Sequence, residues 1–190
     1  MIIPLKSRFL QLSDEEFFLF CREMRDFRIE RTADGTILLM SPTGSQSGNL
    51  NGEITSELFY WNRKSKLGIA FDSSTGFTFP NGAVRAPDSA WIQRGRWDAL
   101  TSEEQKRFAP IVPDFVIEIR SETDTLELLR DKLMEYQQQG VRLGWLIDPV
   151  EQEVWIYRGN GTIDQVNDFK SPLSGEDVLP HFELRVVDFW

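Results

Sequence analysis

The sequence is poor in the side chains that most often bind transition metals or form disulfides. Its 190 residues include one cysteine, Cys21, and one histidine, His181. A single cysteine excludes an intrachain disulfide, and a single histidine excludes a multi-histidine zinc site and most Ser-His-Asp catalytic triads. We expect Cys21 to be a small buried residue on the first helix. We expect His181 to have a structural role.

Long apolar runs are also missing, and positive charge is scarce. No apolar segment approaches the roughly 20 residues of a transmembrane helix, and Met1 to Leu10 lacks the pattern of a signal peptide. These features predict a cytoplasmic protein without membrane contact. Lys and Arg total 21 against 30 Asp and Glu, a formal net charge of −9. This balance argues against a broad nucleic-acid-binding surface, although a local cluster of cations is compatible with it.

Core-forming residues, by contrast, are abundant. Apolar residues make up 41% of the chain and include fourteen Phe and six Trp, enough to bury a sizeable core. There is no internal repeat, low-complexity tract or linker. We therefore expect residues 1–190 to form a single domain.

The order of helix and strand signals predicts a mixed α/β (α+β) fold. Ser13 and Glu16 form a capping box that begins a helix reaching about Met24. Further helices are expected at about 46–66 and 124–139, and an irregular excursion with a short helix at 93–112. Strands are expected at 27–31, 36–40, 69–72, 76–79, 84–85, 87–92, 115–119, 144–148, 154–158 and 162–166.

Two acidic residues lie in or beside strands that read as buried. Glu118 stands inside the apolar run 115–119, and Asp88 follows Pro87 at the start of another such run. A buried carboxylate is costly unless it is paired or bound to a cation. Asp88, Glu118 and the backbone carbonyl of Ile119 would give Mg²⁺ or Mn²⁺ the oxygen ligands that these ions prefer. A metal held in this way can activate water for phosphodiester hydrolysis.

Such a site also needs a cationic side chain, and the sequence offers two. Arg120 lies two residues after Glu118, on the same strand face, and could stabilise charge but not act as a base. Lys132 lies at the edge of the apolar face of the following helix and could reach over the sheet. Alternatively, the methylene groups of Lys132 pack on apolar surface and its ammonium stays in water.

Other polar residues are expected to be less important. Glu53 and Glu57 on the second helix fit a solvated helix face, and Ser47 reads as a cap or first-turn residue. Glu30 reads as an exposed strand acid, and Glu135 as a residue turned toward solvent.

Several motifs in one order resemble the Uma2 family (domain of unknown function 820) of the PD-(D/E)XK, restriction-endonuclease-like superfamily. The motifs are Ser41-Pro42-Thr43-Gly44, Pro87-Asp88, Pro113 to Ser121, Asp131-Lys132 to Tyr136, and Gly140 to Pro149. The resemblance implies a mixed β-sheet core flanked by helices, with additional β-hairpins. It also implies Mg²⁺-dependent cleavage of nucleic acid, with Asp88 and Glu118 as the acid pair.

The chain departs from that family pattern at two positions. Arg120 stands where the superfamily has lysine, so Lys132 is expected to be a migrated replacement. Ser47 stands where many members have histidine. Both metal-ligating acids are retained.

Two classes of function follow. The first is an endonuclease that hydrolyses phosphodiester bonds of nucleic acid, with DNA as the expected substrate and a homodimer among the states allowed. The alternative is a catalytically silent nuclease fold acting as a binding or assembly module, which the acidic balance and Arg120 favour. A sugar- or small-acid-binding β protein is a third class, but no local motif supports it.

Overall fold

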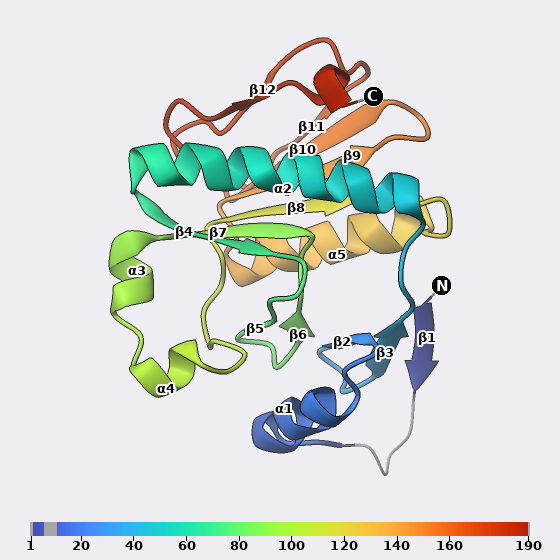
Figure 1. Cartoon of the computed structure of the whole chain (residues 1–190), viewed down its shortest axis with the longest axis vertical. Coiled ribbons are helices and arrows are strands. Elements are labelled where there is room, and N and C mark those ends of the chain that lie inside the picture. Colours follow the sequence, from blue (N-terminus) through green and yellow to red (C-terminus); the bar gives the residue numbers. More distant parts are fainter. Residues whose placement is uncertain (1, 6–10, 190) are drawn as a thin grey trace.

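The computed structural model describes residues 2–5 and 11–189 and contains two main sheets (Figure 1). The helices are α1 (Asp14–Glu23), α2 (Ser45–Ser65), α3 (Arg94–Asp98), α4 (Ser102–Gln105), α5 (Leu126–Gln139) and the 3-10 helix η1 (Val186–Phe189). The strands are β1 (Ile2–Leu5), β2 (Arg28–Arg31), β3 (Ile37–Met40), β4 (Gly68–Asp72), β5 (Phe77–Thr78), β6 (Val84–Arg85), β7 (Ser89–Gln93), β8 (Phe115–Ile119), β9 (Leu143–Asp148), β10 (Glu153–Arg158), β11 (Ile163–Val166), β12 (Leu173–Ser174) and β13 (Glu183–Leu184).

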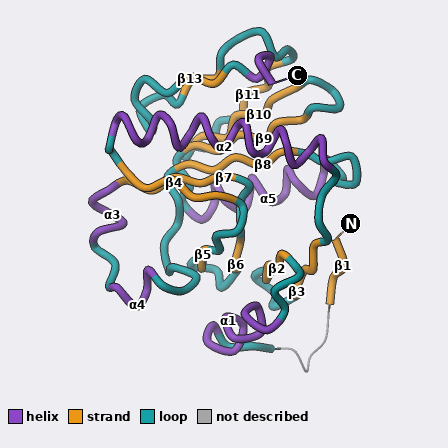
Figure 2. The backbone as a smooth tube through the Cα atoms, in the orientation of Figure 1, coloured by secondary structure: helices purple, strands orange, loops and turns teal. Residues whose placement is uncertain are grey.

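The larger sheet has six strands in the order β11-β10-β9-β8-β7-β4, and helices cover it on both sides (Figure 2). β8 and β9 run parallel, whereas the other neighbouring pairs of this sheet run antiparallel. A parallel pair needs a crossover connection, and α5 supplies it. This agrees with the mixed α+β class expected from the sequence.

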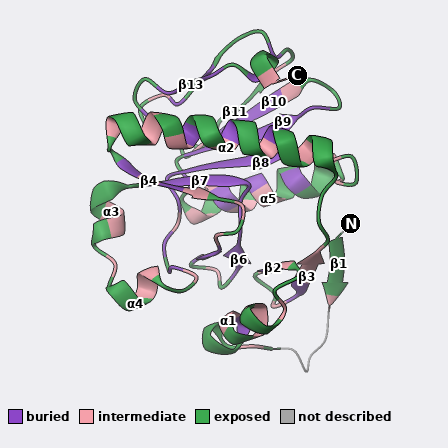
Figure 3. Ribbon diagram, in the orientation of Figure 1, coloured by how far each residue is buried: buried purple, intermediate pink, exposed green. Residues whose placement is uncertain are grey.

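Residues of β8 alternate between the two faces of the large sheet. Phe115, Ile117 and Ile119 join a core with Leu50, Ile54 and Leu58 of α2. Val116 joins the opposite core, with Leu129, Leu133 and Tyr136 of α5. The central strands are buried along their length (Figure 3). Because successive side chains point to opposite faces, Glu118 shares the α5 face with Val116.

The smaller sheet has the order β1-β3-β2-β6-β5 and packs against α1 through Phe17, Ile29, Ile37 and Val84. The capping box at Ser13 and the β2–β3 hairpin are present as predicted. The elements that the sequence did not predict are short: β1, α3, β12, β13 and η1. Each of these five elements spans two to five residues.

Two glycines fix where α5 lies. Gly140 has a φ of +107° and ends the helix in the left-handed conformation. A Cβ at Gly144 of β9 would stand 2.9 Å from Leu133 Cδ1, so glycine lets α5 lie close to the sheet. This close approach brings the side chains of α5 down to β8. Within the described residues, no helix is long and apolar enough to cross a membrane.

Candidate active site

Asp88 is fixed at the start of β7 by two partners. Its Oδ2 accepts a hydrogen bond of 2.8 Å from the backbone N–H of Ile119, and its Oδ1 lies 2.8 Å from Nη1 of Arg28. The first bond places the carboxylate at the residue that follows Glu118. The two acids singled out from the sequence therefore lie at adjoining ends of neighbouring strands.

Glu118 lies on the α5 face of β8 and is 3% exposed. Its Oε1 is 2.8 Å from Nζ of Lys132 and accepts a 2.8 Å hydrogen bond from the hydroxyl of Tyr136. Burial raises the pKa of Glu118 from 4.5 to about 7; Lys132 opposes this rise, whereas the nearby charge of Asp88 adds to it. Glu118 can therefore exchange a proton near neutral pH.

Glu30 belongs to the same cluster, and the expectation that it would be exposed is wrong. It is 2% exposed, and side chains of β6 and α5 contact it. Its Oε1 lies 2.8 Å from Nζ of Lys132, and its Oε2 lies 3.1 Å from Nη1 of Arg85. Burial alone would raise the pKa of Glu30, but Lys132 and Arg85 outweigh it and lower the pKa to about 2. Glu30 therefore stays charged.

These side chains form one group that we call the charge network. Its acids come from β2, the start of β7, β8 and α5, and its cations from β2, β6 and α5. Ion pairs connect Glu135, Arg85, Glu30, Lys132 and Glu118 in series, and Arg28 and Asp88 form a separate pair of the same group. Glu135 was expected to turn toward solvent; instead its Oε2 lies 2.5 Å from Nη2 of Arg85, and its side chain is 18% exposed. The network ties the two sheets together.

Of the two candidate cations, Lys132 contacts one acid of the pair, Glu118, and its ammonium is shared between Glu118 and Glu30. Arg120 instead points to the end of β9. Its Nη1 lies 2.7 Å from Oδ2 of the buried Asp148, and its Nε donates to the carbonyl of Asp124. Arg120 lies just past the last residue of β8, and its side chain bonds to Asp148 and Asp124 and not to the acid pair.

The remaining residues considered from the sequence lie outside the charge network. Glu53 and Glu57 are exposed on α2, and Ser47 is half-buried in its first turn. Cys21 is half-buried on α1, beside the core of the small sheet. His181 is exposed, with a φ of +63°.

The chemistry of the donors at Asp88 and Glu118 fits a hard divalent cation. Both are carboxylates, and Mg²⁺ in enzymes is often bound through one or two carboxylates while it keeps several waters. Among the residues that the structure describes, no three His, Cys, Asp or Glu side chains gather as an all-protein metal cage. Asp88 and Glu118, with the backbone of Ile119 beside them, match the arrangement in which one or two carboxylates and several waters bind Mg²⁺.

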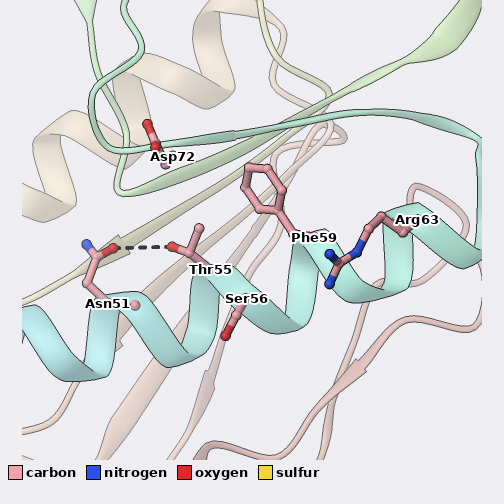
Figure 4. A pocket seen from close by; sticks show the side chains of 7 residues that line it. Asn51, Thr55, Ser56, Phe59, Arg63 and Asp72 are labelled. Carbon is pink, nitrogen blue, oxygen red and sulfur yellow. Dashed lines mark hydrogen bonds between the residues drawn. The ribbon is translucent and has the colours of Figure 1, made fainter.

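An open groove of about 450 Å³ runs along α2 and ends at Asp72 of β4. Asn51, Thr55, Phe59 and Arg63 line it, and Asn51 contacts Thr55 (Figure 4). The Thr55 hydroxyl is also 2.6 Å from the hydroxyl of Ser89, the residue after Asp88. The groove thus lies on the α2 side of the sheet. The contact between Thr55 and Ser89 anchors the start of β7 to α2.

Sequence reasoning missed Arg28, Glu30 and Arg85 as members of the site. The available signal was their spacing: Arg28 and Glu30 share one face of β2, and Arg85 stands three residues before Asp88. A charged strand face usually indicates solvent. Only the packing of the small sheet onto α5 reveals that this face is covered.

The arrangement belongs to the restriction-endonuclease-like class of folds, a mixed sheet between helices with an acid pair at the ends of central strands. The family model Uma2, described as "Putative restriction endonuclease", matches residues 14–187. The chain therefore belongs to the Uma2 family. This agrees with the resemblance drawn from the sequence motifs.

A solved structure supports the same fold. It is described as a putative nuclease belonging to DUF820 from Anabaena variabilis ATCC 29413, and it shares 21% sequence identity with this chain. The TM-score is 0.75, and the match covers 94% of this chain and 97% of the other. A search of curated proteins found no match.

Proposed function

We propose that this chain is a divalent-metal-dependent nuclease that hydrolyses phosphodiester bonds of nucleic acid, with DNA as its expected substrate. One observation carries the proposal: the ammonium of Lys132 lies 2.8 Å from Glu118, while Asp88 is bonded to the backbone of the next residue. An acid pair and an adjoining lysine are the groups that hydrolysis at a metal centre requires. Membership of the Uma2 family supports the same activity.

Asp88 and Glu118, with the carbonyl of Ile119, would hold Mg²⁺ or Mn²⁺. When bound, such an ion lowers the pKa of a coordinated water and neutralises charge on a phosphate. Lys132 would orient the attacking water, since Glu118 and Glu30 fix its ammonium from two sides. Tyr136 would hold Glu118 in place through its hydroxyl. Because both sheets supply these residues, the proposed functional unit is the whole chain as a single domain.

The test is a thermal melt combined with a cleavage assay, each with EDTA and with Mn²⁺. A ligand that binds only the native state stabilises it. Mn²⁺ should therefore raise the melting temperature of the wild type, and Asp88→Asn should abolish both that rise and cleavage of plasmid DNA. Glu53→Gln, an exposed change on α2, is the matched control and should behave as wild type.

A catalytically silent binding module is the second candidate, and the ion pair between Arg28 and Asp88 favours it, because a guanidinium already neutralises one of the two acids. A wild-type melting temperature indifferent to Mn²⁺, with no cleavage of DNA or RNA, would select this candidate over the nuclease.

A further inference from the structure

Arg28 differs from the other two cations of the charge network in how it is held. Lys132 and Arg85 each contact two carboxylates, whereas Arg28 contacts one, that of Asp88. Its Nη2 donates to the carbonyl of Ala86, and its Nε is buried without a hydrogen-bond partner among the described residues. Arg28 is therefore the least satisfied cation of the network.

Arg28 is also the cation nearest to solvent. Its side chain is 30% exposed, compared with 10% for Arg85 and 12% for Lys132. It comes from β2 of the small sheet and reaches Asp88 across the junction between the sheets. A long side chain at the rim can move outward without disturbing the apolar core.

A divalent cation at Asp88 Oδ1 would place a second positive group on the oxygen that Arg28 already contacts. Nη1 of Arg28 stands 2.8 Å from that oxygen, at hydrogen-bond distance. A metal ion bound to the same atom would repel the guanidinium and take its place. The metal that the proposed function requires at Asp88 must therefore compete with Arg28.

The charge balance indicates where the displaced guanidinium would go. The network holds four carboxylates and three cations, so it carries a net negative charge when all are ionised. Adding a divalent cation makes the balance positive by one unit, which is the charge that a phosphodiester neutralises. Arginine binds phosphate oxygens well, because its planar N–H groups can donate in pairs.

We propose that Arg28 is an exchangeable occupant of Asp88: a divalent cation displaces it, and the freed guanidinium binds a phosphate of the nucleic acid. The inference rests on the proposed function and adds a substrate-binding residue to it. Nucleic acid then binds more tightly once the metal is in place, because metal binding supplies the phosphate contact. In this arrangement Arg28 lowers the affinity of the protein for metal in the absence of nucleic acid, because Arg28 must leave Asp88 before the metal binds.

The first measurement is Mn²⁺ binding by titration calorimetry, without nucleic acid. Arg28→Gln should bind Mn²⁺ more tightly than wild type, by a factor on the order of ten, because the competing cation is gone. Arg25→Gln is the control: Arg25 is an exposed arginine three residues away that bonds to the carbonyl of Arg22. If Arg28→Gln does not fold, Arg28→Met, which keeps an apolar stem of similar length, replaces it.

The second measurement is binding of a duplex DNA oligonucleotide, with Ca²⁺ and with EDTA. In Ca²⁺, Arg28→Gln should weaken DNA binding and reduce its salt slope by about one. In EDTA the variant and wild type should bind DNA alike, because Arg28 is then retained by Asp88. A metal-dependent loss of this kind would not follow from a merely structural role.

The outcomes separate the exchange from the nuclease proposal. If wild type binds Mn²⁺ and Arg28→Gln binds it equally or more weakly, the exchange is overturned and the metal site stands. If the variant binds Mn²⁺ and wild type does not, Arg28 blocks the site and is not displaced from it, so both the exchange and the proposed function of the natural chain are overturned. Absence of Mn²⁺ binding by both overturns both, and equal DNA binding in Ca²⁺ overturns the phosphate contact.

Discussion

The two faces of the six-stranded sheet are built from the same strands but differ in kind. The α2 face is mainly apolar, with Ile54 and Leu58 packed on residues such as Phe115 and Ile117. The α5 face is apolar around Leu133 and then gives way to the charge network beside Glu118. The fold therefore separates its stabilising core from its polar cluster by the width of one sheet.

This difference has an energetic basis. Apolar burial contributes roughly 25 cal/mol for each Å² removed from water. Buried ion pairs contribute far less on balance, because desolvation of the charges offsets most of their attraction. The α2 face should therefore carry stability, while the charge network maintains a geometry whose main value is chemical. The predictions below test this division, beginning with the largest effect.

Lys132→Ala should have the largest effect on both cleavage and stability. Proposed cleavage should fall by a factor of about 10² to 10³, as is usual when a positioned hydrogen-bond donor of an active site is removed. Stability should fall by about 3–5 kcal/mol, because Glu118 and Glu30 would lose their shared cation. Steady-state cleavage and urea unfolding provide the two measurements.

Arg120→Ala is the matched control for that prediction. Arg120 pairs with Asp148 outside the charge network, so its removal should affect cleavage much less. The reverse ranking of the two variants would transfer the catalytic role to Arg120.

Ile54→Ala should affect stability alone. Ile54 lies on the buried side of α2 and is 0% exposed. Truncation of such a residue lowers the free energy of unfolding by about 2–5 kcal/mol. Mn²⁺ affinity and cleavage per folded molecule should stay at the wild-type level in conditions where the variant is folded. A large loss of Mn²⁺ affinity in the folded variant would contradict the separation of the two faces.

The smallest effect concerns pH. The pKa of Glu118 is raised from 4.5 to about 7, so its contribution to stability is present below 4.5 and is lost as the pH rises toward 7. Glu30 behaves oppositely: its pKa is lowered to about 2, so its contribution is present above 4.5 and is lost as the pH falls. Melting curves with EDTA across this range, compared with Glu118→Gln, would measure the first effect.

Bound metal should reverse the loss of stability that Glu118 causes as the pH rises toward 7. Because a cation binds the deprotonated carboxylate, stabilisation by Mn²⁺ should grow as the pH rises through about 7. Metal stabilisation that is constant with pH would mean that Glu118 is not a ligand.

Sequence patterns predicted the large elements and the acid pair for identifiable reasons. Glu118 was conspicuous because a lone acid in a five-residue apolar strand is costly, and α2 and α5 have clear periods and end signals. Lys132 could be placed only at the edge of a helix face, so its contact with Glu118 stayed one of two alternatives. The structure decides that contact through the close approach of α5 to β9.

The other half of the charge network depends on tertiary packing. Glu30 looks like a solvated acid in any local window, and its burial goes with contacts to Arg85 and to Lys132, which lies 102 residues further along the chain. Arg28 and Arg85 were missed for the same reason. Local propensity carries no information about which charged strand face will be covered.

The bond between Lys132 and Glu30 spans 102 residues of sequence, and this has a consequence for how the protein is made. During synthesis, β2 leaves the ribosome long before α5 exists, so the nascent chain carries Glu30 and Arg28 without their partners. Closing so long a loop is slow and late in folding. A chain that ends before α5 therefore lacks the assembled cluster, and any hydrolytic capacity would arise only after α5 has been made.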